Sequence, residues 1–348
     1  MLVVSIRQYA RKMANSSTHC KSLLNTLPKM VSHPLSGQIA LVTGASRGIG
    51  QGIALQLGQA GATVYITGRL PAQSENGKAG LGTLEATANE ITERGGKGIP
   101  VYVDHSDMEQ VKALFAKIEK DTNGKLDILV NNAYAAVSAL FSDSGRKKFY
   151  EQEPEFWDLV NNVGLRNHYF CSVYAARIMV ANGRGLIVNV SSPGGLKYLF
   201  NVAYGIGKEA LDRMAADMAV ELKGDGITVV SLWPGAVRTQ LVQIGLDKGT
   251  LAPKTAPMFA EGETIEYAGK AVVALATDQR AIQKTGRILI TADLGDEYGF
   301  EDIDGRRPPN LRSLSSALRQ SGWQKTADYF PAWIKLPGWL MTAACSKL

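Results

Sequence analysis

Acidic residues are missing from the start of the chain, where no Asp or Glu precedes Glu75 among 348 residues. The same stretch carries a series of basic residues: Arg7, Arg11, Lys12, Lys21, Lys29, Arg47 and Arg69. Residues 1–36 are therefore acid-free and periodically basic and also contain Ser and Thr, a composition typical of a mitochondrial transit peptide. A disordered extension is the alternative interpretation, and initiation at Met30 would remove most of the segment.

Cysteine is also scarce, because only Cys20, Cys171 and Cys345 are present, far apart in the sequence. Their spacing predicts neither a metal site nor a disulfide framework, and reduced thiols in an intracellular setting are the simplest interpretation. No apolar run reaches the roughly 18 residues of a membrane-spanning helix, which argues against a span. The net charge is +6, but no basic face is interleaved with aromatic residues, so nucleic acid is not an expected partner.

From Gly37 onward the chain alternates between strand-like and helix-like patterns. Apolar runs typical of buried strands lie at 39–43, 63–67, 99–103, 127–131, 186–190, 227–232 and 287–291. Stretches with helical spacing lie between them, for example at 109–120 and 207–222. This alternation predicts an α/β fold, a doubly wound Rossmann-type domain with a seven-stranded parallel sheet and helices on both faces. No linker interrupts residues 37–300, so they are expected to form one domain.

Residues 301–348 form a C-terminal tail that contains an aromatic, apolar stretch at 329–341, broken by Pro331 and Pro337. The stretch is too short to cross a bilayer. Its Trp and Lys residues suit peripheral contact with a membrane surface, and packing against the domain or a partner subunit is the alternative. Upstream of the tail, the Pro- and Gly-containing segment 236–265 is expected to form a flap over the substrate.

A glycine-rich turn, Thr43-Gly-Ala-Ser-Arg-Gly-Ile-Gly50, follows the first expected strand and opens a helix. Gly44 permits the tight turn, Gly48 lets the backbone approach a pyrophosphate, and Gly50 allows the helix to pack closely on the strand. The N-terminus of the helix then faces the phosphates of a dinucleotide. We therefore predict a cofactor site that includes Gly44, Ser46, Arg47, Gly48, Ile49 and Gly50.

The end of the second strand distinguishes between the two dinucleotides. An NAD site usually carries Asp or Glu there, to accept hydrogen bonds from the ribose 2′-hydroxyl. Here the strand runs into Gly68-Arg69, and an arginine offers a charged fork for a 2′-phosphate. Arg47 adds a second cation, so NADP(H) is the predicted cofactor, with a solvated loop arginine as the alternative. Asp104, after the third strand, is predicted to accept from the adenine amino group, with loop capping as the alternative.

Tyr204 and Lys208 lie four residues apart and therefore share one face of a helix. A free phenol has a pKa of about 10, too high for ready proton exchange near neutrality. Lowering that pKa by two or three units needs roughly 3–4 kcal/mol, and one positive charge about 4 Å away supplies roughly 4 kcal/mol at an effective dielectric of 20. We therefore predict that Lys208 lowers the pKa of Tyr204, which acts as the acid in reduction and the base in oxidation.

These motifs together resemble the classical short-chain dehydrogenases/reductases over residues 37–295. The matching residues are Thr43–Gly50, Asp104, Asn131-Asn-Ala133, Ser192, Tyr204, Lys208 and Pro234-Gly235 followed by Thr239. The resemblance implies that Thr239 binds the nicotinamide carboxamide, that Asn131 supports the adenosine side of the cofactor, and that Lys208 also bonds the nicotinamide ribose. It further implies an NADPH-dependent carbonyl reductase of hydrophobic steroid and xenobiotic ketones or aldehydes, associated with the endoplasmic reticulum and assembled as a homo-oligomer.

Either of two adjacent serines could hold and polarise the substrate carbonyl. The usual family spacing to the tyrosine favours Ser191, whereas continuity with the strand at 186–190 and with Gly195 favours Ser192. We predict Ser192, with the loop one residue short and Ser191 as a hydrogen-bonding residue at the end of the strand.

Two residues depart from the family pattern. Tyr134 replaces the usual glycine and is expected to place a bulky ring along the cleft or to pack in the core. Gly164 falls where the family carries an asparagine in its proton relay, although the family holds the relay water through a backbone carbonyl there. An NADP(H)-binding regulatory or scaffold protein with weakened catalysis is therefore the alternative function.

Overall fold

The computed structural model describes residues 33–70, 82–247, 256–320, 322–331 and 333–345. The expected basic leader, residues 1–36, lies outside the described residues up to residue 32. Residues 33–36 are described, and the compact unit begins at Pro34, three residues before the expected start of the domain at residue 37. Leu35 is fully buried in the hydrophobic core, and its N–H donates to the carbonyl of Ala60 at 2.9 Å. Burial of one leucine therefore moves this boundary towards the N-terminus.

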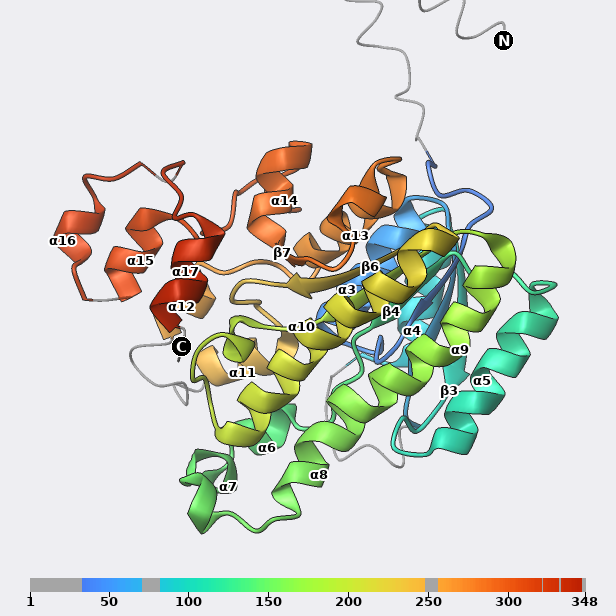
Figure 1. Ribbon diagram of the computed structural model, residues 1–348, viewed down its shortest axis with the longest axis horizontal. Coiled ribbons are helices and arrows are strands. Elements are labelled where there is room, and N and C mark those ends of the chain that lie inside the picture. The colour runs from blue at the N-terminus through green and yellow to red at the C-terminus, as the bar shows by residue number, and fades with distance from the viewer. Residues whose placement is uncertain (1–32, 71–81, 248–255, 321, 332, 346–348) are drawn as a thin grey trace, which may run out of the picture. The chain divides into compact units, whose positions relative to one another are not determined.

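Seven parallel strands form the centre of the molecule, in the order β3-β2-β1-β4-β5-β6-β7 (Figure 1). Their bounds are β1 (Ile39–Val42), β2 (Thr63–Gly68), β3 (Lys97–Tyr102), β4 (Ile128–Asn131), β5 (Gly185–Val190), β6 (Ile227–Trp233) and β7 (Ile288–Ile290). Each lies within two residues of the run predicted for it, and the predicted fold class is confirmed. In register, Leu41 of β1 pairs with Tyr65 on one side and with Leu129 on the other.

The α-helices lie between and after the strands. They are α3 (Gly48–Gln59), α4 (Leu84–Glu93), α5 (Met108–Asp121), α6 (Val137–Phe141), α7 (Asp143–Arg146), α8 (Phe156–Asn161), α9 (Asn167–Asn182), α10 (Val202–Leu222), α11 (Gln240–Asp247), α12 (Ala256–Ala260), α13 (Tyr267–Thr277), α14 (Thr291–Tyr298), α15 (Leu314–Gln320), α16 (Gln324–Ala327) and α17 (Gly338–Cys345). Short 3-10 turns are η2 (Phe149–Glu151), η4 (Pro193–Gly195), η5 (Lys223–Asp225) and η6 (Ala281–Lys284), and η3 (Asn162–Arg166) is π-helical.

Helices cover both faces of the sheet, because successive strand residues point to opposite sides. Ala40 and Val42 of β1 pack with α3, α4 and α13 on one face, whereas Leu41 packs with α5, α9 and α10 on the other (Figure 1). Helix α5 shows how the sequence specifies this layer, since the Asp107 side chain caps its N-terminus. Its buried residues recur at helical spacing and form one apolar stripe: Val111, Leu114, Phe115 and Ile118.

The C-terminal tail belongs to the same compact unit as the sheet, and its helices α15–α17 lie beyond β7 (Figure 1). Asp293 of α14 fastens it, accepting hydrogen bonds from Asn310 at 2.9 Å, Arg312 at 2.8 Å and Lys335 at 2.7 Å. The expected flap carries α11 and α12, with its residues 248–255 outside the described part. Among the described helices, none has the length and apolar character needed to cross a membrane.

Candidate active site

A cleft of about 1250 Å³ lies along the carboxyl ends of the strands, where the strand order reverses between β1 and β4. Doubly wound sheets bind their ligands at this switch point. All but one of the residues predicted for the site line the cleft: Gly44, Ser46, Arg47, Gly48, Ile49, Gly50, Arg69, Asp104, Ser192, Tyr204, Lys208 and Thr239. Asn131 is the exception.

Asn131 is fully buried behind the cleft. Its amide nitrogen donates to the Ser172 hydroxyl and to the Asn189 side chain, both at 2.9 Å, so it ties β4 to β5 and α9. Its neighbour Asn132 lines the cleft instead, and its amide holds the carbonyls of Thr43 and Gly44 at 2.8 and 3.0 Å. Strand alternation turns the two side chains in opposite directions, which the Asn-Asn pair did not reveal in the sequence.

The glycine turn forms one end of the cleft. Gly44 has a φ of +67°, and a Cβ there would lie 2.7 Å from the Cα of Ala133, so the turn requires glycine. Helix α3 begins at Gly48 with no side-chain cap and no acidic residue in its first turn. Its N-terminal N–H groups and helix dipole therefore suit an anion such as a pyrophosphate.

Two arginines flank this helix N-terminus. Burial lowers the pKa of Arg47, and the positive charge of Arg69 lowers it further. Two guanidinium groups in one cleft repel each other. An anion bound between them relieves this repulsion, so the pair favours anion binding. In the described part of the chain no ion pair involves Arg69, which is exposed. The cleft therefore fits the phosphates of a dinucleotide.

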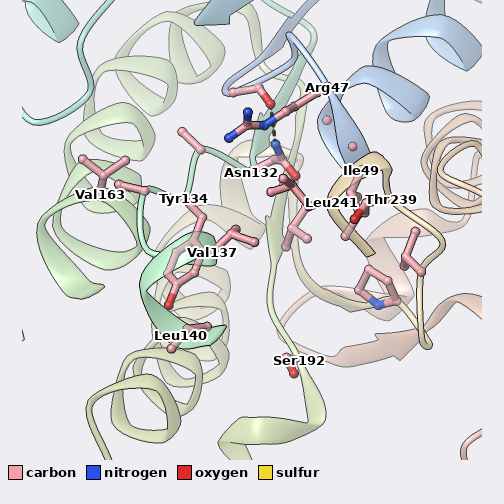
Figure 2. Close-up of a pocket in the computed structure, with 18 of the residues that line it drawn as sticks. Arg47, Ile49, Asn132, Tyr134, Val137, Leu140, Val163, Ser192, Thr239 and Leu241 are labelled. Atoms are coloured by element: carbon pink, nitrogen blue, oxygen red, sulfur yellow. Dashed lines mark hydrogen bonds between the residues drawn. The ribbon is translucent and has the colours of Figure 1, made fainter. Parts of the chain in front are cut away.

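Gln240, at the start of α11, was not predicted from the sequence. Its side-chain oxygen accepts from the N–H of Gly48 at 2.9 Å, and its amide nitrogen donates to the Gln51 side chain at 2.8 Å. Thr239 lies beside the same turn, because a Cβ on Gly48 would be 3.6 Å from its methyl group. Figure 2 shows Thr239 close to Ile49 across this end of the pocket. A lone glutamine at the start of a helix carries no motif, so adjacency to Thr239 was the only signal.

Asp104 lines the cleft beyond β3, but one oxygen of its carboxylate is already engaged. It accepts from the N–H of Ser106 at 2.9 Å and from the Ser106 hydroxyl at 2.7 Å. The capping alternative is therefore present in the structure, and contact with adenine stays a prediction. His105, which follows it, is buried and also lines the cleft, with Nε2 2.7 Å from the Thr67 hydroxyl.

Tyr204 and Lys208 lie in the first two turns of α10, both buried against the cleft. The Asn201 side chain caps the helix by accepting from the N–H of Tyr204 at 3.0 Å, which fixes the start of the helix at Val202. Lys208 donates from Nζ to the carbonyl of Val190 at 3.1 Å, and Nζ lies 5.8 Å from the centre of the Tyr204 ring. The predicted pair is thus brought together at the end of β5.

The pKa of Tyr204 does not behave as the sequence argument predicted. Burial of the phenol raises its pKa to about 12, and the hydrogen bond with Ser192 opposes this only in part. Burial also lowers the pKa of Lys208 to about 8, against the effect of the Asp212 carboxylate. Desolvation of the phenol therefore dominates, and the negative charge of Asp212 raises the pKa of Tyr204 further. The phenol keeps its proton near neutrality, the form needed by a proton donor.

The two adjacent serines have different partners. Ser191 is buried and donates from its hydroxyl to the carbonyl of Lys208 at 3.0 Å, which fastens α10 to the end of β5. Ser192 accepts from the N–H of Gly194 at 3.1 Å, and its hydroxyl bonds with Tyr204. Gly194 is required here, because a Cβ would lie 2.4 Å from the Tyr204 ring. The geometry favours Ser192 as the hydroxyl that acts with Tyr204.

The cleft is apolar around this hydroxyl pair. The lining includes Val137, Leu140, Phe141, Leu199, Phe200, Val242, Met258, Phe259 and Leu311. Figure 2 shows Tyr134 projecting past Val137 towards Leu140. Phe200 has a φ of +59°, unusual for a bulky residue, and its ring meets that of Tyr204 edge to face at 5.0 Å. Leu311 comes from the C-terminal tail.

Glu263 supports the loop between β6 and Thr239 from behind. One of its oxygens accepts from the N–H of Gly235 at 2.8 Å and from the Thr291 hydroxyl. Burial raises the pKa of this carboxyl to about 7, although both hydrogen bonds lower it. No sequence motif indicates this contact, because 28 residues separate Glu263 from Gly235.

Known proteins match this arrangement over most of the chain. The family model described as short chain dehydrogenase matches residues 38–247. Dehydrogenase/reductase SDR family member 1 of Mus musculus is 48% identical over 322 residues, covering 90% of this chain and 99% of that protein. NADPH-dependent aldehyde reductase 2, chloroplastic, of Arabidopsis thaliana is 32% identical over 240 residues, covering 67% and 85%. A short chain dehydrogenase from Mycobacterium thermoresistibile superimposes with a TM-score of 0.64 at 28% identity, covering 77% and 90%.

Proposed function

Because the chain belongs to the short-chain dehydrogenase/reductase family of oxidoreductases, whose cofactor is NAD(H) or NADP(H), we propose that it uses NADPH to reduce the carbonyl of a hydrophobic ketone or aldehyde. The observation that carries the proposal is the hydroxyl pair of Ser192 and Tyr204 at the end of an apolar cleft. A largely apolar lining with a few convergent polar groups orients a hydrophobic molecule by its one polar atom. A steroid ketone, or a xenobiotic of similar polarity, is such a hydrophobic molecule with few polar atoms.

The preference for NADPH rests on Arg47 and Arg69. Both line the cleft beside the N-terminus of α3, and their charges repel each other. A 2′-phosphate accepts charge-assisted hydrogen bonds from such a pair, whereas a 2′-hydroxyl needs an acidic acceptor, which Gly68-Arg69 does not provide. The Arabidopsis relative is named as an NADPH-dependent aldehyde reductase, which supports the same cofactor and reaction type.

A nicotinamide dinucleotide held by the glycine turn, Arg47 and Arg69 would supply the hydride for the carbonyl carbon. Ser192 donates a hydrogen bond to the carbonyl oxygen and holds it beside the phenol of Tyr204. Tyr204 gives its proton to that oxygen as the C=O bond becomes CH–OH, and then recovers a proton from solvent. Lys208 keeps a positive charge beside the phenol and stabilises the phenolate that forms.

The direct test incubates the purified full chain with NADPH and a panel of steroid, aromatic and aliphatic carbonyls. We expect loss of the reduced-nicotinamide absorbance with at least one hydrophobic member, and slower loss with NADH. Tight NADPH binding without turnover on any member would instead support the regulatory or scaffold alternative. Absence of both binding and turnover would contradict either function.

We propose that the tail contacts a membrane surface at the endoplasmic reticulum. Its aromatic side chains are strongly exposed: Trp323, Tyr329, Trp333 and Trp339. Tryptophan and tyrosine favour the headgroup region of a bilayer. Fractionation of cells should place the full chain with microsomes, and Trp333→Ala with Trp339→Ala should release it. Recovery of both proteins in the soluble fraction would contradict the proposal, and recovery in mitochondria that needs residues 1–29 would favour the leader instead.

A further inference from the structure

The two residues that depart from the family pattern, Tyr134 and Gly164, lie in direct contact. Gly164 lies in the π-helical turn η3 with a φ of +154° and ψ of −21°. A Cβ there would lie 2.4 Å from Cδ2 and 2.7 Å from Cε2 of the Tyr134 ring. Heavy atoms do not approach so closely, so any side chain at position 164 needs the ring to move. The ring fills the space that a side chain at position 164 would need.

Tyr134 also contacts the catalytic pair. Nζ of Lys208 lies over the ring, 4.9 Å from its centre, closer than the 5.8 Å to the ring of Tyr204. The rings of Tyr134 and Tyr204 meet edge to face at 6.2 Å. The hydroxyl of Tyr134 is buried without a hydrogen-bond partner among the described residues. The contacts to the pair therefore come from the ring and not from the hydroxyl.

We propose that Tyr134 is a positioning residue, whose ring face holds the Lys208 ammonium beside Tyr204, and that Gly164 is the space this ring requires. A cation over an aromatic face within about 6 Å is attracted by the ring quadrupole, more strongly when the pair is desolvated. The role in catalysis rests on the proposed function; the ring–ammonium contact does not. The glycine at the family's asparagine position is then the counterpart of Tyr134 and not a sign of lapsed activity.

Several other groups also face Lys208 and affect the charge of its ammonium. Asp212, one turn further along α10, favours the charged ammonium, whereas burial disfavours it. His168 on α9 is held neutral, since burial and the Lys208 charge lower its pKa to about 3. The carbonyl of Val190 accepts from Nζ, and the Tyr204 phenol stays protonated near neutrality. Tyr134 is a further contact of Lys208, and it can be changed without altering any of these charges.

The first test measures the pKa of Lys208 directly, by NMR titration of the full chain with labelled lysine, assigned through Lys208→Arg. Tyr134→Leu removes the ring face, so the pKa of Lys208 should fall by about 0.5 to 1 unit. Tyr134→Phe keeps the ring face and should keep the wild-type value. Tyr150→Leu is the matched control, because it removes a ring under the Lys148 ammonium at 5.7 Å outside the cleft. An equal shift in the Phe and Leu variants, or none in either, would overturn the proposal.

The second test is a double-mutant cycle on the pair. Gly164→Ala should lower the melting temperature more in the wild type than in Tyr134→Ala, where the space is open. Backbone strain from the positive φ is common to both arms and cancels in the difference. Equal losses in the two backgrounds would show that the contact does not couple the residues.

The two tests separate this proposal from the proposed function. A wild type that turns over no carbonyl with NADPH contradicts the function, yet the titration and the melting cycle still report on Tyr134. Where turnover is found, Tyr134→Leu should lower kcat up to about tenfold with KM for NADPH little changed, and Tyr134→Phe should restore it.

Discussion

The two ends of the cleft are built in different ways. At the cofactor end, Gly44 to Gly50 are consecutive residues, placed by one strand, one turn and the start of α3. At the catalytic end, Tyr134, Ser192 and Tyr204 come from three segments and meet only in the folded chain. The tail adds Leu311 to this second end. Local backbone conformation specifies the glycine turn of the first end, which Asn132 and Gln240 support from distant segments. Tertiary contacts specify the second end.

The difference implies that the two ends can be damaged separately. A substitution at the catalytic end should change turnover and leave dinucleotide binding, because no residue of the glycine turn depends on Ser192 or Tyr204. A substitution at the cofactor end should change the choice of dinucleotide and leave the proton transfer.

The largest effect is expected from Tyr204→Phe. Removing the proton donor should lower turnover by roughly 10²- to 10⁴-fold, the usual contribution of general acid catalysis. NADPH affinity, measured by fluorescence titration, should change little, since the ring and the N-cap of α10 are kept. Tyr65→Phe is the matched control: Tyr65 is a buried tyrosine of β2 that does not line the cleft. Wild-type turnover in Tyr204→Phe would contradict the assignment of the donor.

Glu263→Gln should remove a pH dependence of stability at the cofactor end, where Glu263 supports the loop that leads to Thr239. Burial raises the pKa of Glu263 from 4.5 to about 7 in the folded state. Its contribution is therefore complete below about pH 4.5 and is lost as the pH rises through 7, which amounts to about 3 kcal/mol. Glutamine cannot ionise, so the difference in unfolding free energy between pH 5 and pH 8 should shrink by about that amount.

Denaturant unfolding at the two pH values measures this difference. Glu261→Gln, two residues away and exposed, is the matched control and should keep the wild-type pH dependence. An unchanged profile in Glu263→Gln would show that the carboxyl does not titrate in this range.

Arg69→Asp tests the cofactor end. The substitution removes the charged fork and supplies an acceptor for a ribose hydroxyl, so the preference for NADPH over NADH should fall roughly 10- to 100-fold. The ratio of kcat/KM for the two dinucleotides measures it. Arg146→Asp makes the same charge change on α7, an exposed residue that lines the other end of the cleft, and should leave the ratio unchanged. An unaltered ratio in Arg69→Asp would show that this arginine does not contact the 2′-phosphate.

The same contrast explains which features of the fold and the site could be predicted from the sequence. The fold class, the seven strands and the glycine turn follow from local periodicity and from backbone conformations that only glycine adopts readily. The placement of Tyr204 beside Lys208 follows from helical spacing. The pKa of Tyr204 does not, because its largest determinant is burial of the phenol, which depends on the whole fold.

Contacts between residues far apart in the sequence could likewise not be predicted. Tyr134 and Gly164 were each recognised as departures from the family pattern, but their contact at 2.4 Å is a property of the folded chain. Glu263 and Gln240 reach the site from segments without a motif. Asn131 and Asn132 are adjacent in sequence, and only the direction of the strand decides which of them lines the cleft.

The smallest predicted effect concerns the tail, which contributes Leu311 to the catalytic end of the cleft. Asp293 holds it through Arg312 and Lys335, side chains that are about a quarter exposed. Burial would raise the pKa of Asp293, but the bonds from Lys335, Asn310 and Arg312 outweigh it and lower the pKa. The carboxylate therefore stabilises the tail at neutral pH, and this stabilisation is lost in acid as the pH falls through the lowered pKa.

Asp293→Asn should loosen the segment around residues 311–336 at neutral pH by about 1 kcal/mol, since partly exposed ion pairs are screened by solvent. Hydrogen exchange of this segment should then be up to about fivefold faster, with no change in the glycine turn. Asp328→Asn is the matched control, because its ion pair with Arg319 is largely exposed and lies within the tail. Faster exchange at the glycine turn in Asp293→Asn would show that the two ends are coupled. Because Leu311 lines the cleft, a loosened tail should raise KM for a hydrophobic carbonyl while KM for NADPH stays the same.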